Sequence, residues 1–141
     1  EAMSVYCPGT NVTQDDRALV ERLLSACGRA LELPEDRFDA VTALSGSGPA
    51  FLCYFLKGMI DAGVAQGLLR DHAVLLAEQT MLGTARLLME KGMDPETLIR
   101  DVTSARGTTA AGLDVLAASD VTPVIGETIR AAAVRSRALS R

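Results

Sequence analysis

The sequence has no tryptophan, a single histidine and three widely spaced cysteines, and these shortages exclude several kinds of chemistry. No cysteine pair at ligand spacing accompanies His72, so no metal site is predicted. Cys7, Cys27 and Cys53 are odd in number and lie in apolar surroundings, which is typical of reduced thiols and not of a disulfide framework. We expect free, mostly buried thiols, and we expect His72 on the exposed first turn of a helix.

Positive charge and long apolar runs are also scarce. The net charge is −4, and no basic run is interleaved with aromatic residues, which argues against a nucleic-acid surface. The longest apolar run, 50–60, is interrupted by Lys57 and Gly58 and falls short of the roughly 20 residues that a bilayer span needs. No secretory leader is recognisable at the N-terminus. We therefore expect no nucleic-acid partner, no membrane partner and a cytoplasmic location.

The first part of the chain has α/β character. Residues 3–7 and 29–33 have strand propensity, and between them residues 14–27 place apolar side chains at helical spacing. Two short strands cannot form a stable sheet by themselves, so their partner strands are expected elsewhere. The first residues therefore look like a cut through a longer protein.

From residue 34 onward only helices are predicted. A short helix is expected to end at the break 45–49, with Pro49 at the first position of the next helix and Ser47 or Gly48 as its cap. That next helix, 49–67, is apolar on almost every side. It should therefore be buried on nearly every side, either at the centre of a bundle or against a second subunit.

The later helices are marked by their start and stop residues. Asp71 can cap one helix, and Gly92 ends it. Asp94 and Pro95 start a short helix, because a capping carboxylate followed by proline is a common helix start. Two more helices are expected, at 109–118 and from Thr122–Pro123 onward.

The turn before the helix at 109–118 is the strongest candidate for a binding site. Residues 102–113 read VTSARGTTAAGL, a polar, glycine-containing turn that leads into a helix of small residues. The first N–H groups of a helix lack partners within it, so such a turn can bind a carboxylate or phosphate. In the simpler interpretation, Thr108 or Thr109 only caps the helix and Gly107 only turns the chain. The local pattern by itself favours the simpler interpretation.

Two segments together resemble one family. They are residues 39–51, DAVTALSGSGPAF, and residues 101–113, DVTSARGTTAAGL. In this order, separated by two apolar helices, they are similar to the C-terminal domain of pyrroline-5-carboxylate reductase. The resemblance implies a mainly α fold, with a helical dimerisation and substrate-binding domain at 34–141. It also implies that residues 1–33 are a β-α-β remnant of a Rossmann-like dinucleotide-binding domain.

The resemblance implies the reduction of 1-pyrroline-5-carboxylate to L-proline with NADPH or NADH. Ser104, Gly107 and Thr108 would bind the substrate carboxylate, and the Thr109 hydroxyl would hydrogen-bond the ring nitrogen as the catalytic, polarising group. Ser45 and Ser47 are weaker candidates, since glycines and serines there also suit a helix cap or a close helix approach. The resemblance further implies a homodimer, with a higher ring of dimers as a possible assembly.

The chain departs from the family in two ways. The family usually has Ser-Pro-Gly-Gly where this chain has Ser104-Ala105-Arg106-Gly107, so Arg106 either weakens the turn or adds a cation beside the bound anion. In addition, no G-x-G-x-x-G follows a strand, so the fingerprint for a cofactor pyrophosphate is missing and this chain alone should be inactive. Two alternatives remain open. The chain could be a non-catalytic dimerisation module, or the C-terminal domain of another imino-acid or hydroxy-acid dehydrogenase.

Overall fold

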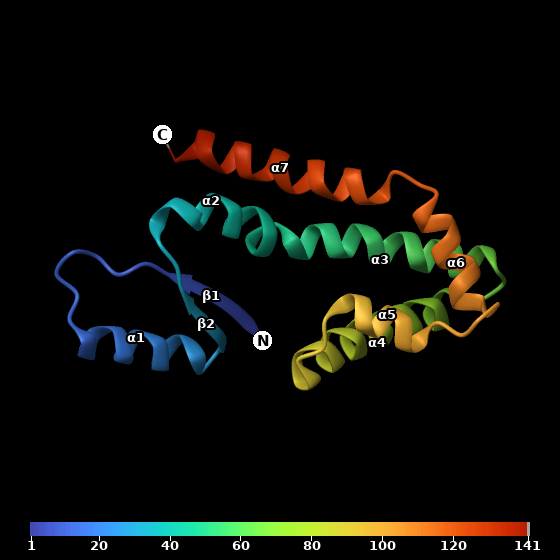
Figure 1. Ribbon diagram of the computed structural model, residues 1–141, viewed down its shortest axis with the longest axis horizontal. Helices are drawn as coiled ribbons and strands as arrows, with labels where there is room; N and C mark the ends of the chain where they lie inside the picture. The colour runs from blue at the N-terminus through green and yellow to red at the C-terminus, as the bar shows by residue number, and fades with distance from the viewer. Residues whose placement is uncertain (141) are drawn as a thin grey trace. The chain divides into compact units, whose positions relative to one another are not determined.

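A short parallel β-α-β unit leads into a series of helices in the computed structural model, which describes residues 1–140 (Figure 1). The elements in chain order are β1 (Ala2–Tyr6), α1 (Gln14–Ser25), β2 (Gly28–Glu32), η1 (Glu35–Arg37), α2 (Phe38–Val41), η2 (Thr42–Gly46), α3 (Gly48–Ala65), α4 (Arg70–Lys91), α5 (Pro95–Val102), α6 (Thr108–Ala117) and α7 (Val121–Leu139). The predicted fold class, mainly α with a small β-α-β unit at the start, is confirmed.

The β-α-β unit is held by strand pairing and by a well-capped helix. β1 and β2 pair in parallel, with Ala2 opposite Gly28 and Tyr6 opposite Glu32. A Cβ at Gly28 would lie 2.1 Å from the Ala2 carbonyl oxygen, so only glycine allows the strands to approach this closely. Each strand begins one residue earlier than predicted, which is the usual uncertainty at element ends.

Helix α1 begins with a capping box. The Thr13 hydroxyl accepts the Asp16 N–H at 3.2 Å, and the Asp16 carboxylate accepts the Thr13 N–H at 3.0 Å. The Thr13 hydroxyl also donates to the Asp16 carboxylate, and this bond, followed by the one from the Thr13 N–H, lowers the pKa of Asp16. Arg17 pairs with Glu32 at 2.8 Å and so ties α1 to β2.

The predicted helix break at residues 45–49 is shorter than expected. The chain widens into the π-helical turn η2, in which the Ser47 N–H donates to the Thr42 carbonyl at 2.8 Å, and only Ser47 lies between η2 and α3. A π-turn adds one residue per turn and keeps the backbone bonded, so a single residue suffices to separate the two helical segments. Pro49 accordingly takes the second position of α3 and not the first.

The chain groups into two compact units. One consists of Glu1–Pro49 with the segment from Gly126 onward, and the other of Ala50–Ile125. In the first unit the Ser136 hydroxyl donates to the Asp39 carboxylate at 2.7 Å, which joins α7 to α2. In the second unit the core is small and consists of Ile60, Ala73 and Ala77, with Leu56 and Val74 packed against it. The division predicted at residues 33 and 34 stays a prediction.

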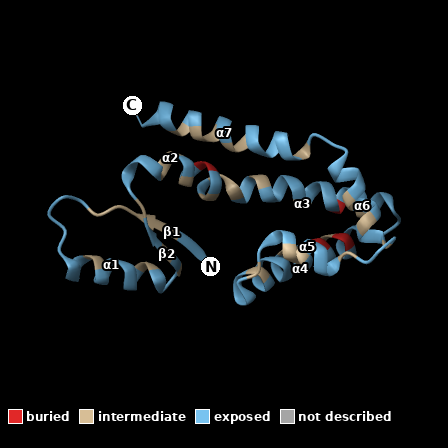
Figure 2. Cartoon of the chain, in the orientation of Figure 1, coloured by how far each residue is buried: buried red, intermediate tan, exposed pale blue. Residues whose placement is uncertain are grey.

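Much of each helix is coloured as exposed in Figure 2, and many of the exposed residues are large and apolar. On α3, Tyr54 is 81% exposed, Leu52 is 56% exposed and Phe55 is 49% exposed, while Ile60 is the buried residue of the helix. The single chain therefore does not bury this helix at the centre of a bundle, and its burial against a second subunit stays a prediction. Too little of the chain packs around α3 to cover its apolar faces.

The predicted helix ends were partly right. Gly92 ends α4 in the left-handed conformation with φ 59°, as expected of a helix-terminating glycine. However, Leu69 precedes α4 without a side-chain cap, so Asp71 lies inside the first turn and does not cap it. The last helix begins at Val121, which places Pro123 within its first turn.

The exposure of the single histidine agrees with the prediction, whereas that of the cysteines does not. His72 is exposed in the first turn of α4, as predicted. All three cysteines are free, which confirms that part of the prediction, but Cys27 and Cys53 are exposed and Cys7 is half-buried, so mostly buried thiols are not found. Between residues 1 and 140, no helix has both the length and the apolar character needed to cross a membrane.

Candidate functional site

The segment between α5 and α6 folds as a hydrogen-bonded four-residue turn. The Gly107 N–H donates to the Ser104 carbonyl at 3.0 Å, and Arg106, the third residue of the turn, has φ 59°. A positive φ at the third position is the mark of a type II turn, in which proline commonly takes the second position and glycine the third. Ala105 and Arg106 thus occupy the second and third positions of this turn.

Arg106 is strained. Arg106 is the one non-glycine residue with a positive φ among residues 1–140. A residue with a Cβ in this region costs about 1 kcal/mol or more relative to an ordinary conformation. The sequence allowed either an ordinary backbone conformation or strain at this position, and the structure has the strained one.

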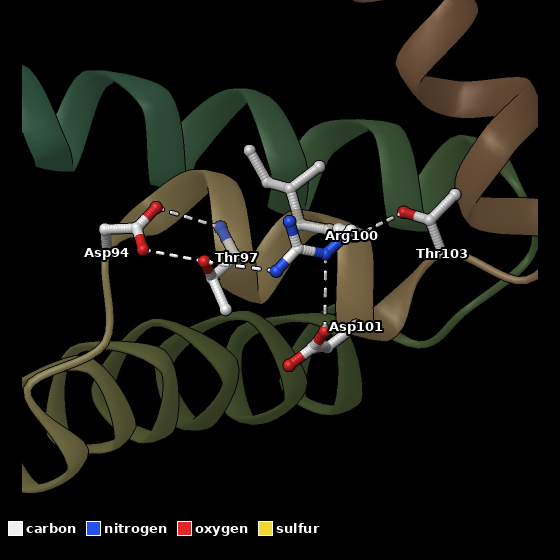
Figure 3. A network of polar contacts seen from close by, with 6 residues as sticks. Asp94, Thr97, Arg100, Asp101 and Thr103 are labelled. Atoms are coloured by element: carbon white, nitrogen blue, oxygen red, sulfur yellow. Dashed lines mark hydrogen bonds and ion pairs between the residues drawn. The ribbon is translucent and has the colours of Figure 1, made fainter.

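Helix α5 fixes the point from which the turn starts (Figure 3). The Asp94 carboxylate accepts the Thr97 N–H at 3.0 Å and the Thr97 hydroxyl at 2.7 Å, which caps the N-terminus of α5. At the other end, the Thr103 hydroxyl donates to the Ile99 carbonyl at 2.5 Å. Both ends of this short helix are therefore closed by side chains, so the turn begins from an ordered residue.

The Asp94 carboxylate is charged and well bonded. Its pKa lies below the ordinary value because the Thr97 hydroxyl and the Thr97 N–H both donate to it. The Arg100 side chain continues the contacts along the helix, since it donates to the Thr97 hydroxyl at 3.3 Å and lies 3.8 Å from the Asp101 carboxylate. The sequence predicted the cap at Asp94 but not this network. A polar side chain at every third residue, from Asp94 to Thr103, is the pattern in the sequence that could have indicated it.

Helix α6 begins without a side-chain cap. Gly107 is its N-cap, with φ −81° and ψ 174°, and the Gly107 carbonyl accepts the Ala111 N–H at 3.2 Å. The interpretation in which Thr108 or Thr109 caps the helix is therefore wrong, because the turn places the helix start one residue earlier. Since glycine has no side chain to accept them, the first N–H groups of α6 are available to an external anion.

The side chains around this helix start are exposed and unpaired. Ser104, Arg106, Thr108 and Thr109 are all exposed, and none of the four side chains makes a hydrogen bond or ion pair within residues 1–140. A Cβ at Gly107 would lie 2.2 Å from the Ser104 hydroxyl oxygen, so the missing side chain leaves room for that hydroxyl beside the turn. Three hydroxyls and one guanidinium are thus free to bind a ligand at one helix N-terminus.

Ser45 and Ser47 are associated with the π-helical turn η2. Ser45 is half-buried in the π-turn η2, and Ser47 is half-buried at its end. Both belong to the first unit, whereas the turn before α6 belongs to the second. Their part in a binding site stays a prediction.

An apolar groove between α4 and α5 was not predicted. Its cavity measures about 680 Å³, and its walls include Gly83, Leu87 and Ile99. Thr80 and Thr84 also line it, but their hydroxyls donate to the carbonyls of Leu76 and Thr80 in their own helix. The threonine methyl groups remain to line the groove, which makes it a packing surface and not a polar site.

The fold and the turn define a class of protein: a helical domain that follows a short β-α-β unit and carries an uncapped helix start suited to an anion. A family model described as pyrroline-5-carboxylate reductase dimerisation matches residues 35–139. The chain belongs to this family, as its two motifs predicted.

Similar proteins of known sequence include pyrroline-5-carboxylate reductases. The chain is 45% identical over its whole length to a pyrroline-5-carboxylate reductase of Arabidopsis thaliana, of which it covers 51%, and 40% identical to one of Methanosarcina acetivorans, of which it covers 52%. The chain thus spans about half the length of the curated relatives it matches.

Solved structures agree with the fold. A pyrroline-5-carboxylate reductase of Coxiella burnetii matches with a TM-score of 0.95 at 31% identity, over 99% of this chain and 52% of that chain. A pyrroline carboxylate reductase of Plasmodium falciparum, solved with NADP bound, matches with a TM-score of 0.87 at 31% identity, over 97% of this chain and 52% of that chain.

Proposed function

We propose that this chain is the helical, substrate-binding part of a pyrroline-5-carboxylate reductase, which reduces 1-pyrroline-5-carboxylate to L-proline. The observation that carries the proposal is the match to reductases over the whole chain, at 45% identity in one case, together with the uncapped start of α6. The substrate class is taken from the names of the similar reductases, and an anion site next to a hydrogen-bond donor is compatible with a small cyclic imine that carries a carboxylate.

The turn binds the substrate carboxylate in this proposal. The N–H groups at the start of α6 point toward the anion, and the helix dipole adds a partial positive charge there. Ser104 and Thr108 supply hydroxyls, and Gly107 keeps the approach open because it has no Cβ. The carboxylate is thereby held in one orientation, which fixes the distance of the C=N bond from the reductant.

Thr109 acts at the ring nitrogen. Its hydroxyl is exposed, one residue into α6, and donates a hydrogen bond to the nitrogen or accepts one from the protonated iminium. Polarising the C=N bond makes its carbon a better hydride acceptor. Thr109 is a positioning and polarising group and not a nucleophile, and no histidine or paired carboxylate near the turn serves as a general base.

The hydride donor is a nicotinamide cofactor in this proposal, NADPH or NADH. The residues present do not fit its pyrophosphate, because the loop from β1 to α1 has one glycine, Gly9, where the dinucleotide fingerprint needs three. The pyrophosphate would therefore be bound by residues outside this chain. The division into a dinucleotide-binding remnant at 1–33 and a helical domain at 34–141 belongs to the same proposal, as does a cytoplasmic location.

A homodimer is part of the proposal. The family model that matches the chain describes a dimerisation domain. In the single chain, α3 exposes Leu52, Tyr54 and Phe55. Monomers rarely leave several large apolar side chains of one helix exposed, so a second copy is the partner expected to cover them. A ring of several dimers is a further assembly compatible with the proposal.

The proposal is tested by removing the two threonine hydroxyls in the full-length protein. With Thr108→Val and Thr109→Val combined, we expect kcat to fall about 100-fold or more, because the imine loses its polarising donor. Thr109→Ser, which keeps the hydroxyl, should retain most of the activity.

The matched control is Thr84→Val, since that hydroxyl bonds its own helix. Near wild-type reduction by the double variant would remove Thr108 and Thr109 from the site. A wild-type protein that reduces another imino or hydroxy acid, and not pyrroline-5-carboxylate, would overturn the substrate. A tight dimer that neither binds nor reduces any of these acids would favour a non-catalytic dimerisation module.

A further inference from the structure

We infer that the second half of α7, residues 126–140, is a strap that Asp39 fastens onto α2 and η2, and that the π-helical form of η2 depends on this attachment. All of these residues belong to the first compact unit. Figure 1 shows this half of α7 beside α2. The inference does not rest on the proposed function, because it concerns how one segment of the chain is held by another.

The Asp39 carboxylate receives two contacts from the strap. Its Oδ1 atom accepts the Ser136 hydroxyl at 2.7 Å, and its Oδ2 atom accepts the Arg137 Nε–H at 3.4 Å. The Asp39 side chain is 26% exposed, whereas that of Asp36, three residues earlier, is 71% exposed. The Arg137 bond is long and its guanidinium is exposed, so the Ser136 hydroxyl makes the stronger contact.

Ser136 makes this contact in place of the one that its own helix offers. The hydroxyls of Thr80, Thr84 and Ser140 donate to the carbonyl four residues earlier in the same helix, at 2.7, 2.8 and 3.2 Å. A serine inside a helix has such a carbonyl within reach. The Ser136 hydroxyl nevertheless donates to a carboxylate 97 positions away in the sequence. A charged acceptor is the stronger partner, so this bond favours the position of α7 against α2.

The strap has little apolar surface with which to hold itself in place. Its half-buried residues Ile129, Ala132, Ala133 and Ser136 recur every three or four positions and so form one stripe along α7. Because Ser136 belongs to this stripe, the stripe faces Asp39. Except for Ile129, these residues have short side chains, which bury little apolar surface. The polar contact with Asp39 is therefore a large part of the attachment.

Asp39 and the buried residue of η2 lie on the same face of one helical path. Helix α2 ends at Val41, and η2 begins at the next residue, Thr42. Ala43 is fully buried and lies four residues after Asp39, which places both on the face that the strap covers. A π-helical turn is rare compared with an α-helix, so we expect η2 to depend on the packing around Ala43. The Ser47 N–H, bonded to the Thr42 carbonyl at 2.8 Å, reports whether the turn is closed.

Hydrogen exchange of the full-length protein, followed by mass spectrometry, tests the inference. For Asp39→Ala we expect the amides of residues 129–139 and 43–47 to exchange about tenfold faster, because the acceptor that holds the strap is lost. Ser136→Ala removes one donor and leaves Arg137, so the same two segments should exchange about threefold faster. Combining the two substitutions should add little to Asp39→Ala alone, because both remove the same bond.

Two further variants separate the contact from the loss of a side chain. Asp39→Asn keeps an oxygen that accepts the Ser136 hydroxyl, so its exchange should stay close to that of the wild type. Asp36→Ala is the matched control, because it removes an exposed carboxylate whose contact with Arg37 is 3.5 Å, and it should leave both segments unchanged. Helix α4 belongs to the other unit and serves as the internal reference.

Each other outcome overturns the inference. Faster exchange in residues 129–139 alone would show that η2 does not depend on the strap. Unchanged exchange in both segments would show that Asp39 does not hold it. An equal acceleration in α4 would be a general loss of stability and not the release of one segment. If Asp39→Ala does not fold, the same criteria apply to Ser136→Ala. Reduction of the imine is a separate measurement, so the proposed function stands or fails independently.

Discussion

Single residues around the turn before α6 decide whether it can hold an anion. Gly107 has an ordinary backbone conformation, so its importance is not conformational freedom but the space left by its missing Cβ. The Ser104 hydroxyl lies in that space. At Arg106 the situation is reversed, because a residue with a side chain has a positive φ, a backbone conformation that favours glycine.

Gly107→Ala tests the role of this space. The new Cβ would lie 2.2 Å from the Ser104 hydroxyl oxygen, which must rotate away from the helix start. We expect the KM for pyrroline-5-carboxylate to rise about fivefold in the full-length protein, with little change in fold. Gly112→Ala on α6 is the control, because nothing lies within 4 Å of its added Cβ. If the clash with the hydroxyl is the cause, Gly107→Ala should cost less in the Ser104→Ala background than in the wild type, where the remaining close contact is that to the Ser104 carbonyl oxygen at 3.1 Å.

At the scale of elements, some helix N-termini have a side-chain cap and others do not. Helices α1 and α5 are closed by side chains, with Thr13 and Asp94 as their N-caps. Helix α6 begins at a glycine without a side-chain cap. A capped helix start has bonded one of its free N-terminal N–H groups to a protein side chain, whereas an uncapped start still offers all of them to a ligand. The contrast between α5 and α6 thus places rigidity before the turn and binding capacity after it.

The cap of α5 gives a pH-dependent prediction. The folded protein lowers the pKa of Asp94, so the carboxylate stabilises the fold at pH values above its unfolded pKa, about 3.9. This stability is lost as the pH falls through the depressed pKa. We expect Asp94→Ala to lower the Tm by about 3–8 °C at pH 7.

The same difference in Tm should shrink toward zero in acid, because the wild-type carboxyl then becomes neutral as well. Thermal melts of both proteins from pH 7 down to about pH 2 make the comparison, because the lowered pKa of Asp94 lies below the ordinary value. Asp101→Ala is the control, because its ion pair with Arg100 is long, at 3.8 Å, and exposed. A Tm difference that is constant across this pH range would show that the charge of Asp94 does not support the cap.

At the scale of the whole molecule, the chain buries little apolar surface on its own. The buried hydrophobic residues within 1–140 are Ala43, Ile60, Ala73 and Ala77. Many large apolar side chains on α3 remain exposed, and the groove between α4 and α5 is also apolar. Burial of this surface would supply much of the stability of the folded protein, so stability and assembly should be linked.

Charge on α3 should therefore break the assembly. We expect Leu52→Glu with Phe55→Glu to convert the full-length protein from a dimer or larger oligomer to a monomer, because carboxylates would be buried against apolar groups. Light scattering coupled to size-exclusion chromatography measures the mass. Gln66→Glu, an exposed residue just after α3, adds an acid outside the apolar face and should leave the mass unchanged. An unchanged mass in the double variant would exclude α3 from the interface.

Local chemistry was readable from the sequence. It predicted the strand-helix-strand start, the end of α4 at Gly92, the cap of α5 at Asp94, the exposed His72 and the family. The i,i+4 pair of Lys57 and Asp61, at 2.6 Å, likewise needs only helical spacing. Each of these features depends on residues a few positions apart, so their order in the sequence already contains the necessary information.

The tertiary structure alone decided the rest. Ser136 meets Asp39 from 97 positions away, the π-turn at Thr42–Gly46 shortens a predicted break, and Cys27 and Cys53 are exposed although they lie in apolar sequence. The positive φ of Arg106 and the helix start at Gly107 follow from the closure of one turn between two helices. Burial and closure depend on which distant segments pack together, and a local pattern of residue types does not specify that packing.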